Sequence, residues 1–308
     1  MRSLYTILMA LLLAVSGTAL AQTVNESNRP SKSKPSEQES LALAAMEGLM
    51  QQPPERALPI IKKVLAGTQT PLVKKRALFV LSQIDSQEAD DILLQTARSA
   101  DSSMRTEAIR SIGIGGRDKS LAALQEVYNT GDADVKKQVL HAWMIADRKA
   151  EVFQVAANAK SEDEAAEAIH MLSAMGAVEE LRKLGDRPNA SDRLVEAYAI
   201  SGDLQSLRKI AEGDKDPSVR AEAVRQIGII DTDAARTALR DIYGRATNEE
   251  IKDAALQGLL IADDEQGVLA LYRAAKSPEE KRNLLRTLTN MDGDAALQVI
   301  DDALENKQ

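Results

Sequence analysis

Apolar residues return along most of this chain at intervals of three and four, in runs that polar turns separate. This spacing places the apolar side chains on one face of an α-helix. The run over residues 71–84 has on that face Val73, Ala77, Leu78, Leu81 and Ile84. The run over residues 88–100 has Ala89, Ile92, Leu93 and Ala97. Because no alternating pattern of useful length occurs, we expect helices and no sheet.

Helix starts recur about every thirty residues from Thr70 onward. The predicted N-caps, with spacings of 31, 31, 29, 30, 25, 32 and 29 residues, are Thr70, Asp101, Asp132, Ser161, Ser191, Asp216, Asn248 and Ser277. Three caps are followed directly by proline, which suits the first helical position: Pro71, Pro217 and Pro278. The pairs Ser161 with Glu164 and Ser277 with Glu280 have the spacing of a capping box.

A regular period of this length predicts a repeat array in which each unit contacts only its neighbours. We expect an all-α superhelix, an α-solenoid of about nine stacked antiparallel helix pairs, over residues 39–308. The first pair covers residues 41–50 and 54–65, and the last predicted helix covers residues 295–304. Aromatic residues make up only 3% of the chain and Ala and Leu dominate, so the helices can approach closely. Since the chain has no cysteine, no disulfide supports this core.

The first residues follow a different pattern. Arg2 precedes an apolar stretch from Leu4 to Val15, and a small-residue run ending at Ala21 comes before Gln22. This order is typical of a cleavable signal peptide, here residues 1–21 with cleavage after Ala21. The apolar stretch is shorter than the roughly 20 residues that a membrane-spanning helix needs. We therefore expect a periplasmic or secreted protein with no stable membrane insertion after cleavage.

Residues 22–38 are predicted to be a disordered leader. This segment contains Pro30, Pro35 and several Ser and Thr residues, and it has almost no apolar residue after Val24. Burial of apolar surface could therefore not compensate for the conformational entropy lost on ordering. The chain has 39 basic and 47 acidic residues, and cleavage removes one of the basic residues, Arg2. A chain this acidic repels phosphate backbones, so we expect no nucleic-acid partner.

Two runs resemble the signature Val-Arg-x-x-Ala-x-x-x-Leu-Gly of HEAT repeats. They are residues 219–228, which begin Val219-Arg220, and residues 104–113, which begin Met104-Arg105. Over residues 39–308 the chain is similar to the short bacterial HEAT-like repeats named for phycobilisome lyases, and the similarity is weakest at Ser191, where the helix is shortened. The resemblance implies the stacked fold. It does not specify a chemistry, because HEAT arrays serve many functions.

The resemblance also implies that the helices carrying the signature line the concave side of the array. Nine positions after each cap, and off the apolar face, these helices present a set that we name the ridge: Phe79, Arg110, His141, His170, Arg225, Gln257 and Arg286. With Lys75 and Arg76 beside Phe79, the ridge is the predicted protein-binding site. Arg, His and Phe suit the centre of an interface better than Lys or Glu would. An ordinary solvated helix face is the alternative interpretation.

A second series occupies the signature Arg position, four residues after each cap. Its members are Lys74, Arg105, Lys136, Arg220, Lys252 and Lys281. In HEAT-like stacks this residue commonly pairs with acidic groups of adjoining turns. We therefore expect these side chains to support stacking and not to bind a partner.

The chain offers few residues for catalysis. With two histidines, His141 and His170, and no cysteine, zinc or iron sites built from His and Cys are hard to assemble. The histidines occupy equivalent positions in adjacent units, so a weak metal site completed by carboxylates stays open. Neither is followed by Glu, whereas deoxyhypusine hydroxylase, a HEAT-repeat enzyme, binds iron through His-Glu pairs. Zinc-protease, nucleophile-elbow and Walker motifs are absent, so we expect no enzyme activity and no cofactor.

The glycines from Gly113 to Gly116 suggest a phosphate loop, but Asp118 stands where a dinucleotide fingerprint needs its third glycine. We expect them to end a helix instead. The single tryptophan, Trp143, lies on an apolar face, and Tyr128 and Tyr243 recur at one position of the outer helices. All three are predicted to be core residues.

These observations predict a non-catalytic extracytoplasmic scaffold or adaptor. It would bind a protein of the cell envelope, or a secreted one, along the concave face of the array. An accessory subunit of an enzyme, or a handler of a cofactor like the bilin lyases whose repeats it resembles, is the alternative. A third possibility is a pure spacer whose ridge binds nothing.

Overall fold

The computed structural model describes residues 35–99, 101–186 and 193–291, together with 293, 297, 299–301 and 304. The predicted signal peptide, residues 22–34 of the predicted leader, the predicted cap Ser191 and half of the predicted last helix lie outside this part. The chain divides into a unit that ends at Leu41 and a unit that begins at Ala42. All regular secondary structure of the described residues is helical. None of the described helices is long and apolar enough to cross a membrane.

The helices follow one another with short connections. In chain order they are α2 (Glu37–Leu49), α3 (Pro54–Ala66), α4 (Pro71–Gln83), α5 (Gln87–Ala97), α6 (Ser102–Gly115), α7 (Asp118–Thr130), α8 (Ala133–Ile145), α9 (Lys149–Asn158), α10 (Glu162–Ala174), α11 (Val178–Gly185), α12 (Leu194–Ile200), α13 (Leu204–Ala211), α14 (Pro217–Ile227), α15 (Asp233–Arg245), α16 (Glu249–Ile261), α17 (Glu265–Ala274) and α18 (Pro278–Thr289).

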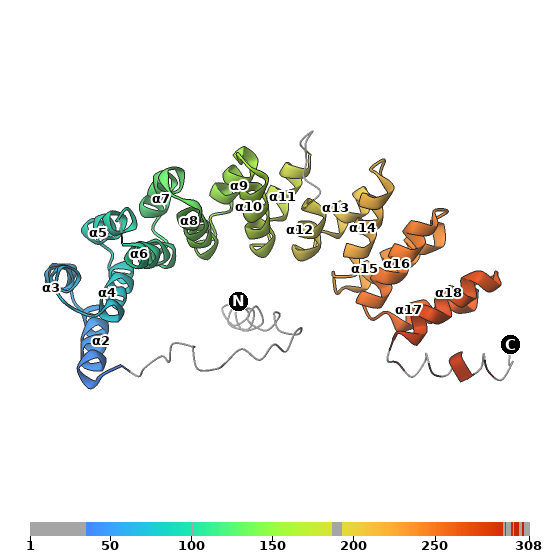
Figure 1. The fold of residues 1–308 in the computed structure, drawn as a ribbon, viewed down its shortest axis with the longest axis horizontal. Helices are drawn as coiled ribbons and strands as arrows, with labels where there is room; N and C mark the ends of the chain where they lie inside the picture. Colours follow the sequence, from blue (N-terminus) through green and yellow to red (C-terminus); the bar gives the residue numbers. More distant parts are fainter. Residues whose placement is uncertain are drawn as a thin grey trace, which may run out of the picture. The chain divides into compact units, whose positions relative to one another are not determined.

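The helices from α4 onward pack in two layers (Figure 1). The even-numbered helices form one layer, in which each contacts the next from α4 to α18. The odd-numbered helices form the other, with contacts between α5 and α7, α9 and α11, and α15 and α17. Each even helix from α4 to α16 also packs against the odd helix that follows it. This arrangement confirms the predicted all-α stack of antiparallel pairs, and the unit around α12 is shortened as expected.

The predicted caps begin the even-numbered helices. The side chain accepts a hydrogen bond from a first-turn N–H at Thr70, Asp101, Asp132, Ser161, Asp216, Asn248 and Ser277. The capping boxes are only half formed, however. The Glu164 carboxylate accepts the N–H of Lys160, 2.8 Å away, and the Glu280 carboxylate accepts the hydroxyl of Tyr243, so both reach outside their own cap.

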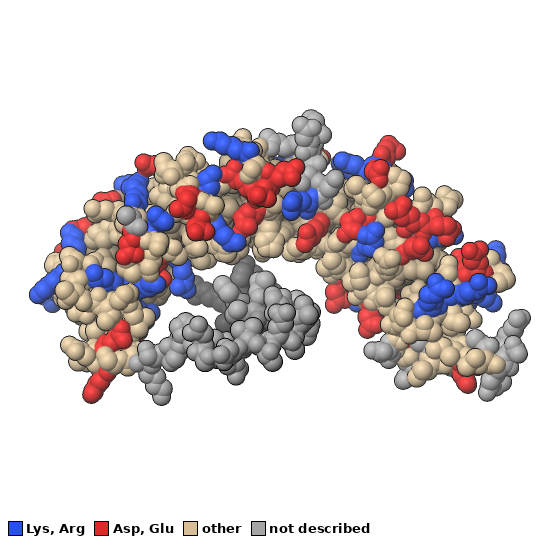
Figure 2. Space-filling model, in the orientation of Figure 1, with Lys and Arg blue, Asp and Glu red and all other residues tan. Residues whose placement is uncertain are grey.

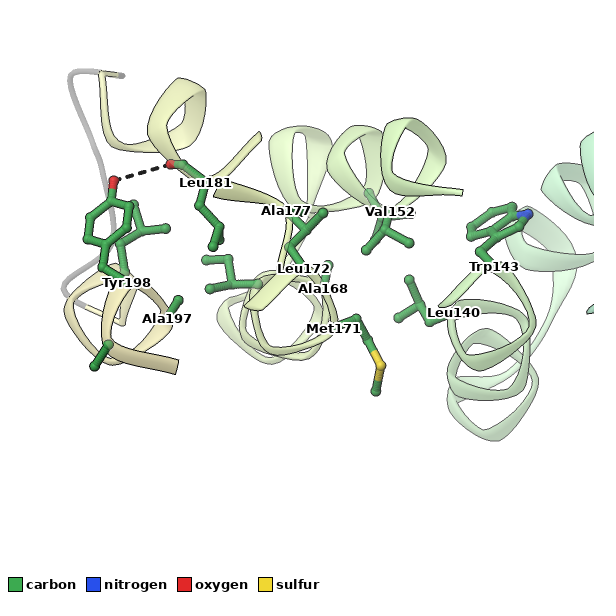
Figure 3. Packing of buried hydrophobic residues seen from close by; sticks show 14 of the residues in the cluster. Leu140, Trp143, Val152, Ala168, Met171, Leu172, Ala177, Leu181, Ala197 and Tyr198 are labelled. Carbon is green, nitrogen blue, oxygen red and sulfur yellow. Dashed lines mark hydrogen bonds between the residues drawn. The ribbon is translucent and has the colours of Figure 1, made fainter. Parts of the chain in front are cut away.

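Aliphatic side chains fill the space between the layers. In Figure 3, Leu140 and Leu172 from the even layer lie opposite Val152 and Leu181 from the odd layer. The fully buried indole of Trp143 donates its N–H to the carbonyl oxygen of Leu121, 3.1 Å away. Its ring stacks on that of Tyr128 with centroids 5.7 Å apart. Trp143, Tyr128 and Tyr243 are thus core residues, as predicted.

Glycine allows two pairs of even helices to approach closely. A Cβ built on Gly113 of α6 would lie 2.8 Å from Cα of Ala142 in α8. One built on Gly228, after α14, would lie 2.7 Å from Cα of Gly258 in α16. Gly116 ends α6 with φ of 65°, a left-handed conformation that favours glycine. Gly116 therefore ends a helix, as expected, whereas the packing role of Gly113 was not predicted.

Candidate protein-interaction surface

The ridge lies on the even-numbered layer, one residue to a helix, and none of its side chains is buried. Arg110, His170, Gln257 and Arg286 are exposed, and the others are half-buried. In α12 the equivalent residue is Glu196, which is exposed and lies five residues before its C-cap, as His141 does in α8. The predicted ridge omits Glu196 because the position of the helix start near Ser191 could not be fixed from the sequence, and α12 begins without a side-chain cap bond at Arg193. The packed even layer thus presents a row of polar side chains.

At the N-terminal end of the ridge, two predicted residues contact each other. The Arg76 guanidinium lies over the Phe79 ring, 4.8 Å from its centroid, and also forms an ion pair with Glu47 of α2. A cation over an aromatic face contributes about 0.5–1 kcal/mol at an exposed site. Lys75 is half-buried beside them on α4. This part of the surface combines an aromatic ring with positive charge.

Two of the ridge arginines have acidic partners on their own helices. Arg110 lies 3.6 Å from Glu107, and Arg225 forms an ion pair with Glu222. Exposed pairs of this kind contribute only about 0–1 kcal/mol. Both arginines can therefore exchange these partners for a bound ligand at little cost.

The two histidines lie on neighbouring helices, with an ion pair between α8 and α10. Lys137 of α8 lies 3.3 Å from Glu167 of α10. Burial lowers the pKa of His141, and so do the charges of Lys137 and His170, while Glu167 acts in the opposite direction. His141 is therefore neutral at pH 7. Within the described part of the chain, no group of three or more His, Asp or Glu side chains could hold a metal ion.

A hollow of about 470 Å³ lies between α10 and α12 on this face. Its lining is mostly polar and acidic. It consists of Asp163, Ala166, Glu167, Ile169, His170, Ser173, Arg193, Glu196, Ala197 and Ile200. Figure 2 shows that acidic side chains also gather over α9 and α10. The middle of the even layer is thus hollowed and negatively charged.

Two residues at the signature Arg position connect neighbouring units, as expected. Arg105 lies 3.7 Å from Asp132, and Lys136 lies 2.9 Å from Glu164, in each case the next unit. The backbone N–H of Lys160 and then the ammonium of Lys136 lower the pKa of Glu164 to about 2. Lys252 departs from this pattern, because it pairs with Glu249 of its own helix.

The structure also reveals Arg–Asp pairs that the sequence analysis missed. Arg182 of α11 donates to both oxygens of Asp203, at 2.8 and 2.7 Å, and the Asp203 side chain is only 1% exposed. Burial raises the pKa of Asp203, but hydrogen bonds from Arg182 and Ser206 outweigh it and leave the pKa below its usual value. Arg240 and Asp264 form a similar pair, 3.1 Å apart. Both aspartates are N-caps of odd-numbered helices, Asp203 of α13 and Asp264 of α17. An N-cap pattern in the sequence could therefore have located them.

Comparison with known protein families agrees with this architecture. A family model described as HEAT repeats matches residues 58–144 and 151–260. The structure of human deoxyhypusine hydroxylase in complex with glycerol is similar at 15% identity and a TM-score of 0.30, over 73% of this chain and 98% of that one. The complex of CpcE and CpcF of phycocyanin lyase from Nostoc is similar at 17% identity and a TM-score of 0.33, over 88% of this chain and 99% of that one. No curated protein matches the sequence.

Proposed function

Because this chain belongs to the HEAT-repeat family, we propose that it is a non-catalytic scaffold that binds another protein along its even-numbered layer. The observation that carries the proposal is the ridge. Consecutive packed helices present Arg, His, Phe and Gln side chains at one position, and none of them is buried. Arrays of this kind form extended binding surfaces, because each unit adds one more row of side chains.

The proposed location is the periplasm or the exterior of the cell, and the partner is then an envelope or secreted protein. The pattern of residues 1–21 supports this location. The proposed location is tested by the intact mass of the protein purified from its source cell. Cleavage after Ala21 supports export, whereas a protein that keeps Arg2 contradicts it.

Affinity capture from an extract of the source cell tests the scaffold. The native chain is compared with a triple variant carrying Arg110→Glu, His141→Ala and Arg225→Glu. A matched control on odd helices carries Lys183→Glu, Gln154→Ala and Arg273→Glu, all at exposed positions. The proposal expects a protein that the native chain and the control capture and the ridge variant loses, with equal thermal stability for all three. Capture by all three forms would contradict a ridge site.

A second candidate is an accessory subunit or cofactor handler, which a second hollow favours. It has a volume of about 450 Å³, lies beside the short helix α12, and is lined by apolar residues that include Leu194, Tyr198 and Ile210. This function requires a small molecule in the purified protein. Mass spectrometry and an absorption spectrum of the denatured protein distinguish it from a scaffold, which would release none.

A further inference from the structure

A polar hollow of about 480 Å³ lies between α7 and α9, which are neighbours in the odd layer (Figure 1). Four carboxamide side chains line it, two from each helix. They are Gln125 and Asn129 of α7 and Gln154 and Asn158 of α9. Gln125 is half-buried and the other three are exposed. We name this hollow the amide groove.

The amide groove opens over the C-terminal halves of its two helices. The first turns of α7 and α9 are joined by an ion pair between Asp118 and Arg148, 2.5 Å apart. Over their whole lengths, however, α7 and α9 pack less closely than α5 on α7 or α9 on α11. The buried side chains of Tyr128 and Val155 lie in the lining and form the floor.

The carboxamides alternate between the two walls along the groove. α7 and α9 are equivalent helices of successive units, with N-caps at Arg117 and Arg148. Counted from these caps, the carboxamides stand at positions 6 and 10 of α9 and at positions 8 and 12 of α7. Because an α-helix rises about 1.5 Å per residue, successive levels differ by about 3 Å and fall on alternate walls.

This alternation matches the backbone of an extended peptide. A β-strand rises about 3.3 Å per residue, and the N–H and C=O groups of successive residues point to opposite sides. A carboxamide carries the same donor and acceptor as a peptide group, so it can bond to a strand as a neighbouring strand does. A strand lying along the amide groove would meet one carboxamide at each successive residue.

The carboxamides bond to one another only within their own walls. Nε2 of Gln125 donates to Oδ1 of Asn129, 3.2 Å away. Nδ2 of Asn158 donates to the backbone oxygen and to Oε1 of Gln154, at 2.9 and 3.1 Å. In the described part of the chain, no hydrogen bond joins a carboxamide of one wall to a carboxamide of the other. Each wall therefore keeps donors and acceptors for a ligand between them.

The charges around the amide groove nearly balance. Its lining includes Lys136, Lys160 and Glu164, and the Glu164 carboxylate accepts the Lys136 ammonium at 2.9 Å. An adjoining hollow of about 550 Å³ shares these three residues and adds one lysine and three acidic residues: Lys137, Asp134, Asp163 and Glu167. Neither an anionic nor a cationic ligand is favoured, so recognition depends on neutral hydrogen-bonding groups.

The amide groove offers no aromatic face to a ligand. Tyr128 is the one aromatic residue among those that line it, and its side chain is buried. The Tyr128 ring stacks on Trp143, and the Lys136 ammonium lies over it, 5.2 Å from the centroid. Nucleobases bind by stacking on open aromatic rings, as many saccharides do. A peptide backbone needs no such face.

We propose that the amide groove binds an extended peptide segment of a partner protein through the backbone of that segment. The four carboxamides take the place of neighbouring strands, so binding depends little on the side chains of the segment. The groove lies in the odd layer, whereas the ridge lies on the even layer. This inference therefore goes beyond the proposed scaffold surface.

Nuclear magnetic resonance of the isotope-labelled full chain tests the groove, because the side-chain amide signals of the four carboxamides report contact at each position. The probe is the acetylated and amidated hexapeptide Thr-Ala-Thr-Ala-Thr-Ala. A second peptide has a methyl group on the backbone nitrogen of each alanine, which removes the donors on one side of the strand. The trisaccharide maltotriose is the third probe.

Two variants accompany the native chain. The groove variant carries Asn129→Leu and Asn158→Leu, one change on each wall. The matched control carries Gln87→Leu and Gln266→Leu, which are exposed positions of α5 and α17. Thermal melts establish that both variants fold, as expected for changes at exposed positions.

The expected result is that the unmodified hexapeptide shifts the signals of all four carboxamides. The methylated peptide and the groove variant should each weaken binding roughly tenfold, because hydrogen bonds are lost, and the control should bind as the native chain does. Added salt should change the affinity little. Equal binding of the two peptides, or no shift at the carboxamides, would overturn the inference. So would shifts caused by maltotriose and not by the hexapeptide, which would indicate a saccharide site.

The peptide test and the affinity capture are independent. The odd-helix control of the capture removes one carboxamide of the groove, Gln154, and should still retain the ridge partner because the ridge lies on the other layer. A failed peptide test with a successful capture rejects the amide groove and retains the scaffold. The reverse outcome retains the amide groove and rejects the ridge.

Discussion

The hydroxyl of Tyr128 donates a hydrogen bond to Oε1 of Glu164, 2.8 Å away, and so joins the end of α7 to the first turn of α10. Lys136 of α8 binds the same oxygen at 2.9 Å and lies over the Tyr128 ring, 5.2 Å from its centroid. Three successive units therefore share one carboxylate. Burial and the contact with Glu164 raise the pKa of Tyr128, so the phenol stays protonated and remains a donor.

Replacing Tyr128 by Phe should lower the free energy of unfolding by about 1 kcal/mol, because one hydrogen bond between units is lost while the packing is kept. Chemical denaturation measures the change. Tyr272→Phe is the matched control, because the Tyr272 hydroxyl donates to no described residue. Equal effects of the two substitutions would contradict a role for the bond.

Glu164 should make the array sensitive to acid. Its pKa falls from 4.5 to about 2 on folding, so its stabilising effect is complete above pH 4.5 and is lost as the pH falls toward 2. Solvent screening limits the effect to the order of 1 kcal/mol. The free energies of unfolding of native protein and Glu164→Gln should therefore differ at pH 7 and converge as the pH falls to about 2. The exposed Glu162→Gln is the control, and a constant difference at both pH values would refute this account.

Gly228→Ala should destabilise the array by about 1–3 kcal/mol, because its Cβ would collide with the backbone of Gly258. Gly244→Ala in α15 is the opposite case. A Cβ there meets nothing within 4 Å, so alanine should add about 0.5–1 kcal/mol through its higher helix propensity. Melting temperatures that shift in the same direction would disprove the proposed close approach of α14 and α16.

Asp263→Gly should stabilise the protein by about 1 kcal/mol, because glycine adopts positive φ without strain. Asp231→Gly serves as the control, since Asp231 does not have positive φ and its substitution also removes the pair with Arg236. If Asp263→Gly lowers the melting temperature, the positive φ of Asp263 does not strain the backbone.

Arg182→Gln should destabilise the protein, because it leaves the buried carboxylate of Asp203 without its cation. The partial exposure of Arg182 keeps the loss below that of a fully buried pair. Arg208→Gln on the neighbouring helix is the control, since Arg208 pairs with the exposed Glu212. Similar losses from both substitutions would show that burial of Asp203 does not govern the effect.

The sequence determined the features that depend on nearby residues. Caps such as Asp132 and Ser277 bond to N–H groups two or three positions away, so their spacing alone locates the helix starts. Apolar intervals of three and four identified the core, including Trp143, because a helix repeats every 3.6 residues. Together these local rules were sufficient to predict the stacked fold.

Only the tertiary structure decided where the side chains at the edges of each unit go. The sequence suggested that Glu164 closes its own capping box, but Tyr128, 36 positions earlier, and Lys160 take the carboxylate. Ile229 and Ile261 resemble core residues by type, yet the packing of α14 on α16 leaves both exposed. The reason is that exposure depends on distances between helices, and the helical period of one segment contains no information about its neighbours.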